Sequence, residues 1–389
     1  MKRLFLPWVR QNDLASRSYI DSPVAVTAES PKAEADLIPR EGGSHIPSLD
    51  GVRAVSIALV FLSHAGVSNL IPGGFGVTVF FFLSGFLITT LLTREQDRYG
   101  GISLKAFYLR RLVRLSPPIL ITMFAATALV VAGLAEGGLS LPTYLSQIFF
   151  FYNYHSLTPG AASSVEGLGI LWSLSVEEHF YFIWPVVFIA IARGWIGIIG
   201  VLVMLTAILA WRYIRMTMMG EGEWTIYIST DTRIDSLLFG CLLALLIWRG
   251  HAARLFPEGR LARLALIAGG LAVLIISFIV RDEVFRSTLR YTVQGIALMP
   301  LFYYAVQRPR DLLFRPLNWT PLQMIGVWSY TIYLCHFVII LSLVYSGVGE
   351  LGNPVLVGLS AALSCGFAAL VWRYIERPLK PLRSRLTGR

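Results

Sequence analysis

The feature that most constrains this chain is a series of apolar stretches of about 20 residues, separated by short charged segments. A helix of that length crosses the roughly 30 Å hydrocarbon core of a bilayer. Only 14% of the residues are charged, against about a quarter in soluble domains. The period-2 alternation of a membrane β-barrel strand is missing. The sequence therefore predicts an all-α, polytopic membrane protein.

The apolar runs predict about ten membrane-spanning helices. The region 136–177 between the third and fourth is aromatic but lacks a run of spanning length, which favours an interfacial or re-entrant element. Around this membrane domain (47–375), residues 1–46 and 376–389 are predicted as cytoplasmic tails, the first of them flexible. The ten predicted spans are residues 52–69, 75–92, 116–135, 178–193, 195–212, 234–248, 264–280, 291–307, 324–345 and 354–372.

The distribution of Lys and Arg predicts the orientation. With the N-terminus in the cytoplasm, all but six of the 33 basic residues fall on the cytoplasmic side, as the positive-inside rule requires. Both termini are therefore expected in the cytoplasm. The six exceptions are Arg212, Arg215, Arg233, Arg281, Arg286 and Arg290.

Charge and cysteine content argue against two other classes of protein. The net charge of +10 is spread over the loops and forms no basic stripe with interleaved aromatics, so no nucleic-acid partner is expected. The cysteines Cys241, Cys335 and Cys365 lie in apolar stretches without CxxC spacing. Neither a disulfide framework nor a metal site is indicated.

The first predicted span contains two ionisable side chains, Arg53 and His64. Their separation is about three helical turns, which places both on one helix face roughly 16 Å apart. An ionisable residue inside a span is costly and marks a candidate functional site. A structural interpretation stays open for both, because neutral His64 can bond a neighbouring helix and Arg53 can extend to the interface.

Basic residues also cluster before the third predicted span. Arg111 and Arg114 are one helical turn apart and can present two guanidinium groups to the same phosphate. Anionic lipid is the alternative partner for arginines in such a position. In the second span, Ser84 lacks the GxSxG context of a nucleophile, so the pattern favours close helix packing there.

Three further polar clusters interrupt apolar helices. Glu177 and Glu178 enter the fourth span; a capping box formed by Ser175 and Glu178 accounts for Glu178 and leaves Glu177 without a structural purpose. Arg233 and Asp235 precede the sixth span and can simply form an ion pair at an interface. The ninth span contains polar rings at i, i+3 and i+6, which need partners in a cavity or on other helices: Tyr330, Tyr333 and His336.

In this order, the motifs resemble those of acyltransferase family 3, a family of multi-pass membrane proteins, over residues 46–380. The resemblance is carried by Leu49-Asp50-Gly51-Val52-Arg53-Ala54 with His64, Gly76-Val77 through Phe80-Phe81 to Ser84-Gly85-Phe86-Leu87, Arg110-Arg111 with Arg114, Trp172-Ser173-Leu174-Ser175-Val176-Glu177 with Phe180-Tyr181, Arg233 with Asp235-Ser236-Leu237, Ser329-Tyr330 with Tyr333-Leu334 and His336, and Glu376-Arg377-Pro378-Leu379.

The resemblance implies transfer of an acyl group, usually acetyl, from cytoplasmic acyl-CoA to a hydroxyl of a glycan or glycolipid at the bacterial cytoplasmic membrane. Acyl-CoA is then a co-substrate, and no bound cofactor is expected. His64 would be the catalytic histidine paired with Arg53, and Arg111 and Arg114 would help to hold the donor. The chain resembles the stand-alone members that lack an extracytoplasmic hydrolase-like domain.

The residues themselves agree with this chemistry. An imidazole titrating near neutrality suits general-base removal of a proton from the acceptor hydroxyl. Glu177 is expected to orient His64 or to bind the sugar. The acceptor or the thioester oxyanion has five candidate partners: Arg233, Asp235, Tyr330, Tyr333 and His336.

The main alternative is a transporter or flippase that moves a lipid-linked sugar or small solute without chemistry. It shares the buried polar residues but gives no reason for the spacing from Arg53 to His64 beside a basic cytoplasmic turn. The sequence leaves open the acceptor glycan, the length of the acyl group and the oligomeric state.

Overall fold

The computed structural model describes residues 47–67 and 72–386. Within this part of the chain every element is helical, apart from an isolated bridge between Gly137 and Val165. The prediction of an all-α fold is confirmed for these residues, whereas the predicted tail 1–46 lies outside them. The longer helices are α2 (Pro47–His64), α3 (Gly73–Tyr99), α4 (Leu104–Val131), α7 (Trp172–Ala192), α8 (Ile198–Thr217), α11 (Asp235–Trp248), α13 (Arg260–Ile279), α15 (Leu289–Gln307), α16 (Thr320–Tyr345) and α17 (Asn353–Val371).

Short helices connect these longer ones. Most lie in the loops between α4 and α7 and between α8 and α15. They are α5 (Leu141–Ile148), α6 (Tyr152–His155), η1 (Leu168–Leu171), α9 (Glu223–Ile228), α10 (Thr230–Arg233), α12 (Ala252–Leu255), α14 (Glu283–Ser287), η2 (Arg315–Asn318), η3 (Val348–Leu351), the π-helical turn η4 (Trp372–Glu376) and α18 (Arg377–Arg385).

In the described ranges, seven helical segments are long and apolar enough to cross a membrane, so the chain is a multi-pass membrane protein. The predicted count of ten is not confirmed. One of the remaining long helices, α11, has 14 residues, short for a span, and it is buried from Asp235 to Ile247. The seven segments are Gly73–Tyr99, Leu104–Val131, Leu168–Ala192, Ile198–Thr217, Arg260–Ile279, Thr320–Tyr345 and Asn353–Leu382.

Small residues bring the central helices together. α2 packs against α3 and α16, and α3 packs against α11. A Cβ atom on Gly326 of α16 would lie 1.9 Å from the backbone oxygen of Asp50 in α2. A Cβ atom on Gly85 of α3 would lie equally close, 1.9 Å, to the backbone oxygen of Leu237 in α11. The backbones therefore touch at glycine, the usual way in which membrane helices pack closely.

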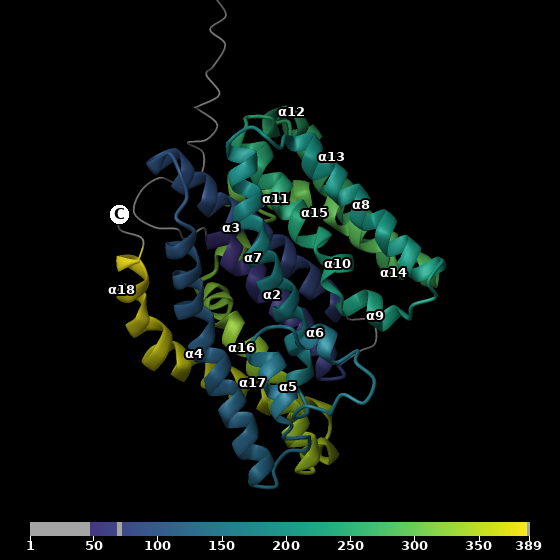
Figure 1. Cartoon of the computed structure of the whole chain (residues 1–389), viewed down its shortest axis with the longest axis vertical. Helices are drawn as coiled ribbons and strands as arrows, with labels where there is room; N and C mark the ends of the chain where they lie inside the picture. Colours follow the sequence, from purple (N-terminus) through teal and green to yellow (C-terminus); the bar gives the residue numbers. More distant parts are fainter. Residues whose placement is uncertain (1–46, 68–71, 387–389) are drawn as a thin grey trace, which may run out of the picture.

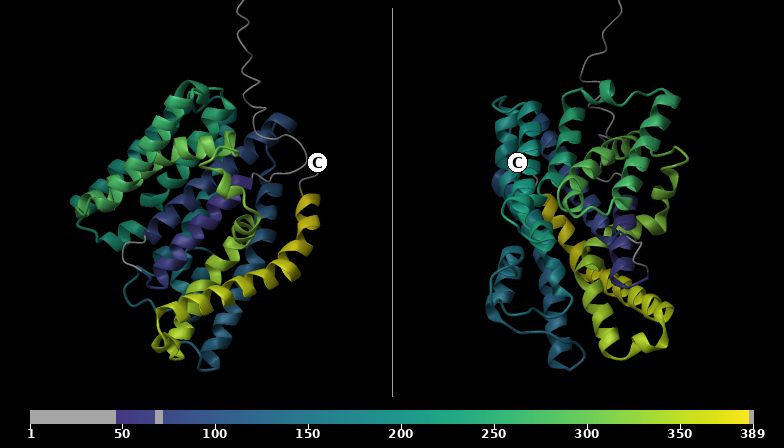
Figure 2. Two further views of the ribbon diagram at one scale, coloured as in Figure 1. Left: turned by 180° about the vertical axis from the view of Figure 1, so that it is seen from behind. Right: turned by 90° about the vertical axis from the view of Figure 1, so that its right-hand side faces the viewer.

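The remaining helices surround this centre. Figure 1 shows α8 and α13 on one flank and α4 with α18 on the opposite flank. Figure 2 shows α17 continuing through η4 into α18 as one long, bent run. The four helices α2, α3, α11 and α16 are thereby enclosed.

The two helices α4 and α7 begin at least six residues earlier than predicted. α4 starts at Leu104, where the Ser103 side chain accepts the Ala106 N–H at 3.4 Å, and it continues through Pro117 and Pro118. The third predicted span started at residue 116, so the helix begins about three turns before it. Arg110, Arg111 and Arg114, which were expected in a cytoplasmic turn, therefore lie inside α4.

α7 begins at Trp172 and directly follows η1, so its first turn lies before the predicted start at 178. Ser175 is therefore inside the helix, and its hydroxyl donates to the Leu171 carbonyl at 3.3 Å. The predicted capping box is wrong, and Glu178 needs another explanation. The region before α7 adds no long helix; it forms α5, α6 and η1. α5 packs on α6, α6 and η1 pack on α7, and η1 also packs on α16.

Candidate functional site

A cavity of about 330 Å³ lies at the end of the bundle where α2 ends and α3 begins. Its walls come from α2, α3, α6, α7, α9 and α16, with His64 at the last position of α2. Most of the other lining side chains are aromatic, among them Tyr152, Trp172, Tyr227 and Tyr333. An apolar pocket with a few converging polar groups is the usual form of a small-molecule site.

His64 is bonded to a second histidine from a distant part of the chain. Its Nδ1 atom lies 2.9 Å from Nε2 of His336 on α16, and the two rings stack with centroids 5.1 Å apart. The ring of Phe337 packs on His64 at 4.4 Å. His64 is half-buried and His336 is fully buried. Packing and the hydrogen bond together fix the orientation of the His64 ring.

The contacts of His336 determine which nitrogen of His64 is free to act. Nδ1 of His336 lies 2.8 Å from the Tyr333 carbonyl and 3.1 Å from the Ile332 carbonyl. Both are acceptors, so this nitrogen carries the proton and, in the neutral ring, Nε2 of His336 accepts. Nδ1 of His64 must then donate to it. In neutral His64, Nε2 is left with a lone pair and can accept a proton.

Tyr333 extends this polar chain along α16. Its ring lies one turn before His336, with the centroids 5.8 Å apart, and lines the cavity. Its hydroxyl lies 2.6 Å from Ser173 Oγ and donates to the Ile170 carbonyl at 3.0 Å. Tyr333 therefore joins the His64–His336 pair to the start of α7. Tyr330, a turn earlier, donates to the Leu115 carbonyl of α4 at 3.0 Å.

Glu177 has partners other than His64. One of its carboxylate oxygens accepts hydrogen bonds from the hydroxyls of Ser84 and Tyr181, the latter at 3.0 Å. The expectation that Glu177 orients His64 is therefore wrong, because His336 fills that position. A direct catalytic role for Glu177 stays a prediction. The structure gives Ser84 a function in helix packing, since its bond ties α3 to α7.

The three arginines predicted to bind the acyl donor differ in their contacts and in their exposure. The Arg111 guanidinium lies 3.2 Å from the ring centre of Tyr181 and 3.9 Å from a Glu178 oxygen. This contact explains Glu178 as a partner of α4. Arg114, one turn later on α4, is exposed. Arg53 donates to Asp50 at 2.6 Å, one turn earlier on α2.

Arg233 and Asp235 do not pair with each other, which corrects the predicted interfacial ion pair. Asp235 accepts from Arg212 at 2.9 Å, and both side chains are completely buried. Arg233 is also fully buried; it donates to Thr78 at 3.2 Å and its guanidinium lies 3.7 Å from the ring centre of Tyr291. Neither Arg233 nor Asp235 lines the cavity; Arg233 contacts its wall from behind, 5.1 Å from Tyr227.

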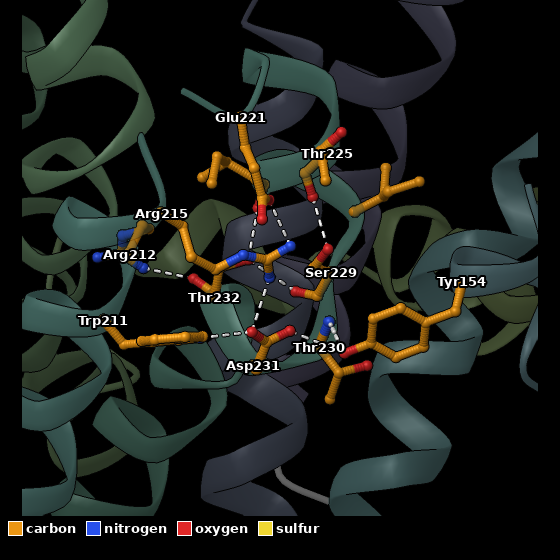
Figure 3. A network of polar contacts seen from close by, with 12 residues as sticks. Tyr154, Trp211, Arg212, Arg215, Glu221, Thr225, Ser229, Thr230, Asp231 and Thr232 are labelled. Atoms are coloured by element: carbon orange, nitrogen blue, oxygen red, sulfur yellow. Dashed lines mark hydrogen bonds and ion pairs between the residues drawn. The ribbon is translucent and has the colours of Figure 1, made fainter. Parts of the chain in front are cut away.

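A second polar network holds the wall of the cavity that α9 provides (Figure 3). Asp231 on α10 accepts from Trp211 at 2.6 Å, from Arg215 at 2.7 Å and from Tyr154 at 2.8 Å. Burial alone raises the pKa of Asp231, but the hydrogen bonds from Trp211 and Tyr154 and the charge of Arg215 outweigh it and hold that pKa below its ordinary value. Because α10 packs on α9, the network anchors α9 to α6 and α8.

We expect Asp231→Asn to lower the free energy of unfolding by about 1–2 kcal/mol, since a partly exposed carboxylate loses its charge-assisted bonds. Thermal unfolding of the purified protein, followed by tryptophan fluorescence, measures the change. Asp97→Asn is the matched control, because Asp97 accepts the Trp248 N–H but has no arginine partner among the described residues. Equal unfolding midpoints for wild type and Asp231→Asn contradict the role of the network.

Sequence reasoning missed several residues of this region. Tyr152, Trp224 and Tyr227 lie in short helices without a long periodic pattern, so they gave no signal. Arg212 did give one: it ends a long apolar run, where a charge needs a partner. The count of basic residues only placed it on the non-cytoplasmic side, at the end of the span 195–212.

Comparison with known proteins places these observations in a family. The protein from Bacillus subtilis (strain 168) named "Putative peptidoglycan O-acetyltransferase YrhL" is 32% identical over 360 residues, which is 86% of this chain and 55% of that protein. The O-acetyltransferase OatA of Staphylococcus aureus (strain NCTC 8325 / PS 47) is 30% identical over 347 residues, which is 86% of this chain and 57% of OatA. The chain thus spans little more than half the length of these relatives.

No solved structure matches the chain. The family described as the acyltransferase domain matches residues 46–373, which include every helix that lines the cavity and both histidines. The chain therefore belongs to the acyltransferase domain family, a family of membrane enzymes that transfer acyl groups.

Proposed function

We propose that this chain is an O-acyltransferase, most simply an O-acetyltransferase, that moves an acyl group from cytoplasmic acyl-CoA to a hydroxyl of a cell-envelope carbohydrate or glycolipid. The observation that carries the proposal is the His336–His64 pair, which leaves Nε2 of His64 as a base in a cavity. Family membership supports acyl transfer. The name of the relative YrhL supports a peptidoglycan-like acceptor.

In the proposed reaction, Nε2 of His64 takes the proton of the acceptor hydroxyl while the oxygen attacks the thioester carbonyl carbon. The carbon–sulfur bond then breaks, the new ester forms, and the departing thiolate takes the proton back from His64. His336 keeps the correct nitrogen of His64 available throughout. Of the predicted oxyanion candidates on α16, Tyr333 lines the same cavity.

The donor is proposed to enter from the opposite end of the bundle. Arg53 is about 16 Å from His64 along α2, and exposed Arg114 lies near the start of α4. These charges suit the phosphates of acyl-CoA, whose thin arm then reaches toward the cavity. Arg111 can join them only by giving up its contact with Tyr181.

This arrangement fits the proposed topology of ten spans with both ends of the chain in the cytoplasm. In addition to the seven long apolar segments, α2, α11 and α15 then cross the membrane inside the bundle. Arg53 and Arg114 face the cytoplasm, and the cavity opens on the other side of the bacterial cytoplasmic membrane. Donor and acceptor therefore approach His64 from opposite sides.

Inside-out membrane vesicles that contain the protein test the proposal. They are given acetyl-CoA labelled in the acetyl group, and label is followed into the carbohydrate and glycolipid fractions. We expect label there with the protein and none in vesicles from cells lacking it. Absence of label in both, with movement of a lipid-linked sugar across the vesicle membrane, would instead support the transporter.

A further inference from the structure

We infer that one wall of the cavity is a binding subsite for a single pyranose ring of the acceptor. The wall consists of Trp172, Trp224 and Tyr227 and is called the aromatic wall below. The inference rests on the proposed function for the chemical class of its ligand. It adds where the sugar binds, through which side chains, and how much of the glycan enters.

The three rings of the aromatic wall form one contiguous apolar surface. The centroids of Trp172 and Tyr227 are 4.7 Å apart, those of Trp224 and Tyr227 are 5.7 Å apart, and those of Trp172 and Trp224 are 6.5 Å apart. Trp172 is buried at the start of α7, whereas Trp224 on α9 is 57% exposed. The ring of Trp224 is inclined by 70° to that of Trp172 and by 34° to that of Tyr227. The apolar face of a single ligand ring can therefore stack on exposed Trp224 while its edge meets the other two rings.

Polar groups around the wall match the hydroxyls of a sugar. Tyr152 and Tyr227 both line the cavity, and neither phenol hydroxyl has a hydrogen-bond partner within the described chain. His64 lines the same cavity. A purely apolar ligand would leave these hydroxyls unpaired, which costs free energy. A pyranose ring offers C–H groups to the aromatic wall and hydroxyls to the two phenols.

The size of the cavity limits the ligand to about one ring. Its volume of about 330 Å³ is at the low end of the roughly 300–1,000 Å³ of small-molecule pockets. A lining glycine helps to keep even this space open, since a Cβ atom on Gly74 would lie 3.0 Å from the Tyr227 hydroxyl. The terminal or side-exposed ring of a glycan enters, and the rest stays outside.

Saturation-transfer NMR on the full chain in lipid nanodiscs tests the subsite without any acyl donor. The probes are the methyl glycosides of glucose, galactose and N-acetylglucosamine, with cyclohexanol as an apolar comparator. We expect saturation of ring C–H protons in at least one glycoside. We expect Trp224→Ala to weaken its binding about tenfold, the size of a lost aromatic contact. Trp224→Phe keeps most of the binding.

Trp195→Ala is the matched control, because Trp195 is also exposed but lies in the loop between α7 and α8 and does not line the cavity. It should bind the glycosides like wild type. The inference is overturned if no glycoside binds, if only cyclohexanol binds, or if Trp224→Ala and wild type bind equally.

The same experiment separates this inference from the proposed function. His64→Ala should still bind the glycoside and should transfer acetyl groups about 10²- to 10⁴-fold more slowly than wild type. If wild type binds the glycoside at the aromatic wall but transfers no acetyl group, the proposed function is contradicted and the subsite is supported. If wild type transfers acetyl groups but Trp224→Ala binds the glycoside as tightly as wild type, the subsite is contradicted and the proposed function is supported.

Discussion

Replacing His64 by alanine is expected to lower kcat for acetyl transfer by about 10²- to 10⁴-fold, the contribution of a positioned general base. The reason is local: Nε2 of His64 is the nitrogen left unprotonated beside the cavity. Initial rates of label transfer from acetyl-CoA, measured with purified protein in nanodiscs, give the change.

His251→Ala is the control for the general effect of removing a histidine. His251 is exposed in the turn after α11, and it does not line the cavity. It should keep the wild-type rate. A His64→Ala variant that inserts normally and retains wild-type kcat would contradict the general-base role.

Replacing His336 by phenylalanine is expected to lower kcat by about 10- to 100-fold, the usual effect of losing a group that orients a functional histidine. Phenylalanine fills the buried space of the His336 ring but offers no acceptor to Nδ1 of His64. His64 is then free to carry its proton on either nitrogen. The KM for the acceptor should stay close to the wild-type value, because His336 does not line the cavity.

Cys335→Ala is the matched control, since Cys335 is the buried neighbour of His336 on α16. It changes packing in the same helical turn and leaves the histidine pair intact. A comparable loss of kcat in Cys335→Ala would show that packing, not the hydrogen bond, explains the effect. A His336→Phe variant with raised acceptor KM and unchanged kcat would place His336 in binding instead.

The sequence predicted most of the long helices because each is apolar over its length. It misjudged the starts of α4 and α7, where the residues before the apolar run are polar or proline-rich. In both cases the neighbouring helices supply partners for those residues. Arg111 in α4 packs on Tyr181 of α7, a tertiary contact that no local pattern records.

Individual site residues were predictable, but their pairings were not. His64 and His336 each stood out as polar rings in apolar helices, yet they are 272 residues apart and meet only because α2 packs against α16. Proximity in sequence suggested that Arg233 pairs with Asp235, whereas Arg212 from α8 takes that position. Such choices depend on how the helices pack, which no local pattern in the sequence records.

The aromatic wall was not predicted because two of its three residues lie in α9, a helix of six residues. Its position over the cavity depends on the Asp231 network, which joins α10 to α6 and α8. A short helix held by side-chain contacts carries little periodic signal of its own.

The most direct test of the central claim is ¹⁵N NMR of the histidine side chains at neutral pH, with His64 assigned by comparison to His64→Ala. The hydrogen bonds predict that the neutral His64 ring is protonated on Nδ1 and unprotonated on Nε2, and that His336→Phe loses this preference. A His64 ring protonated on Nε2 in the wild-type protein would contradict the account, because the nitrogen facing the acceptor would have no lone pair to take its proton.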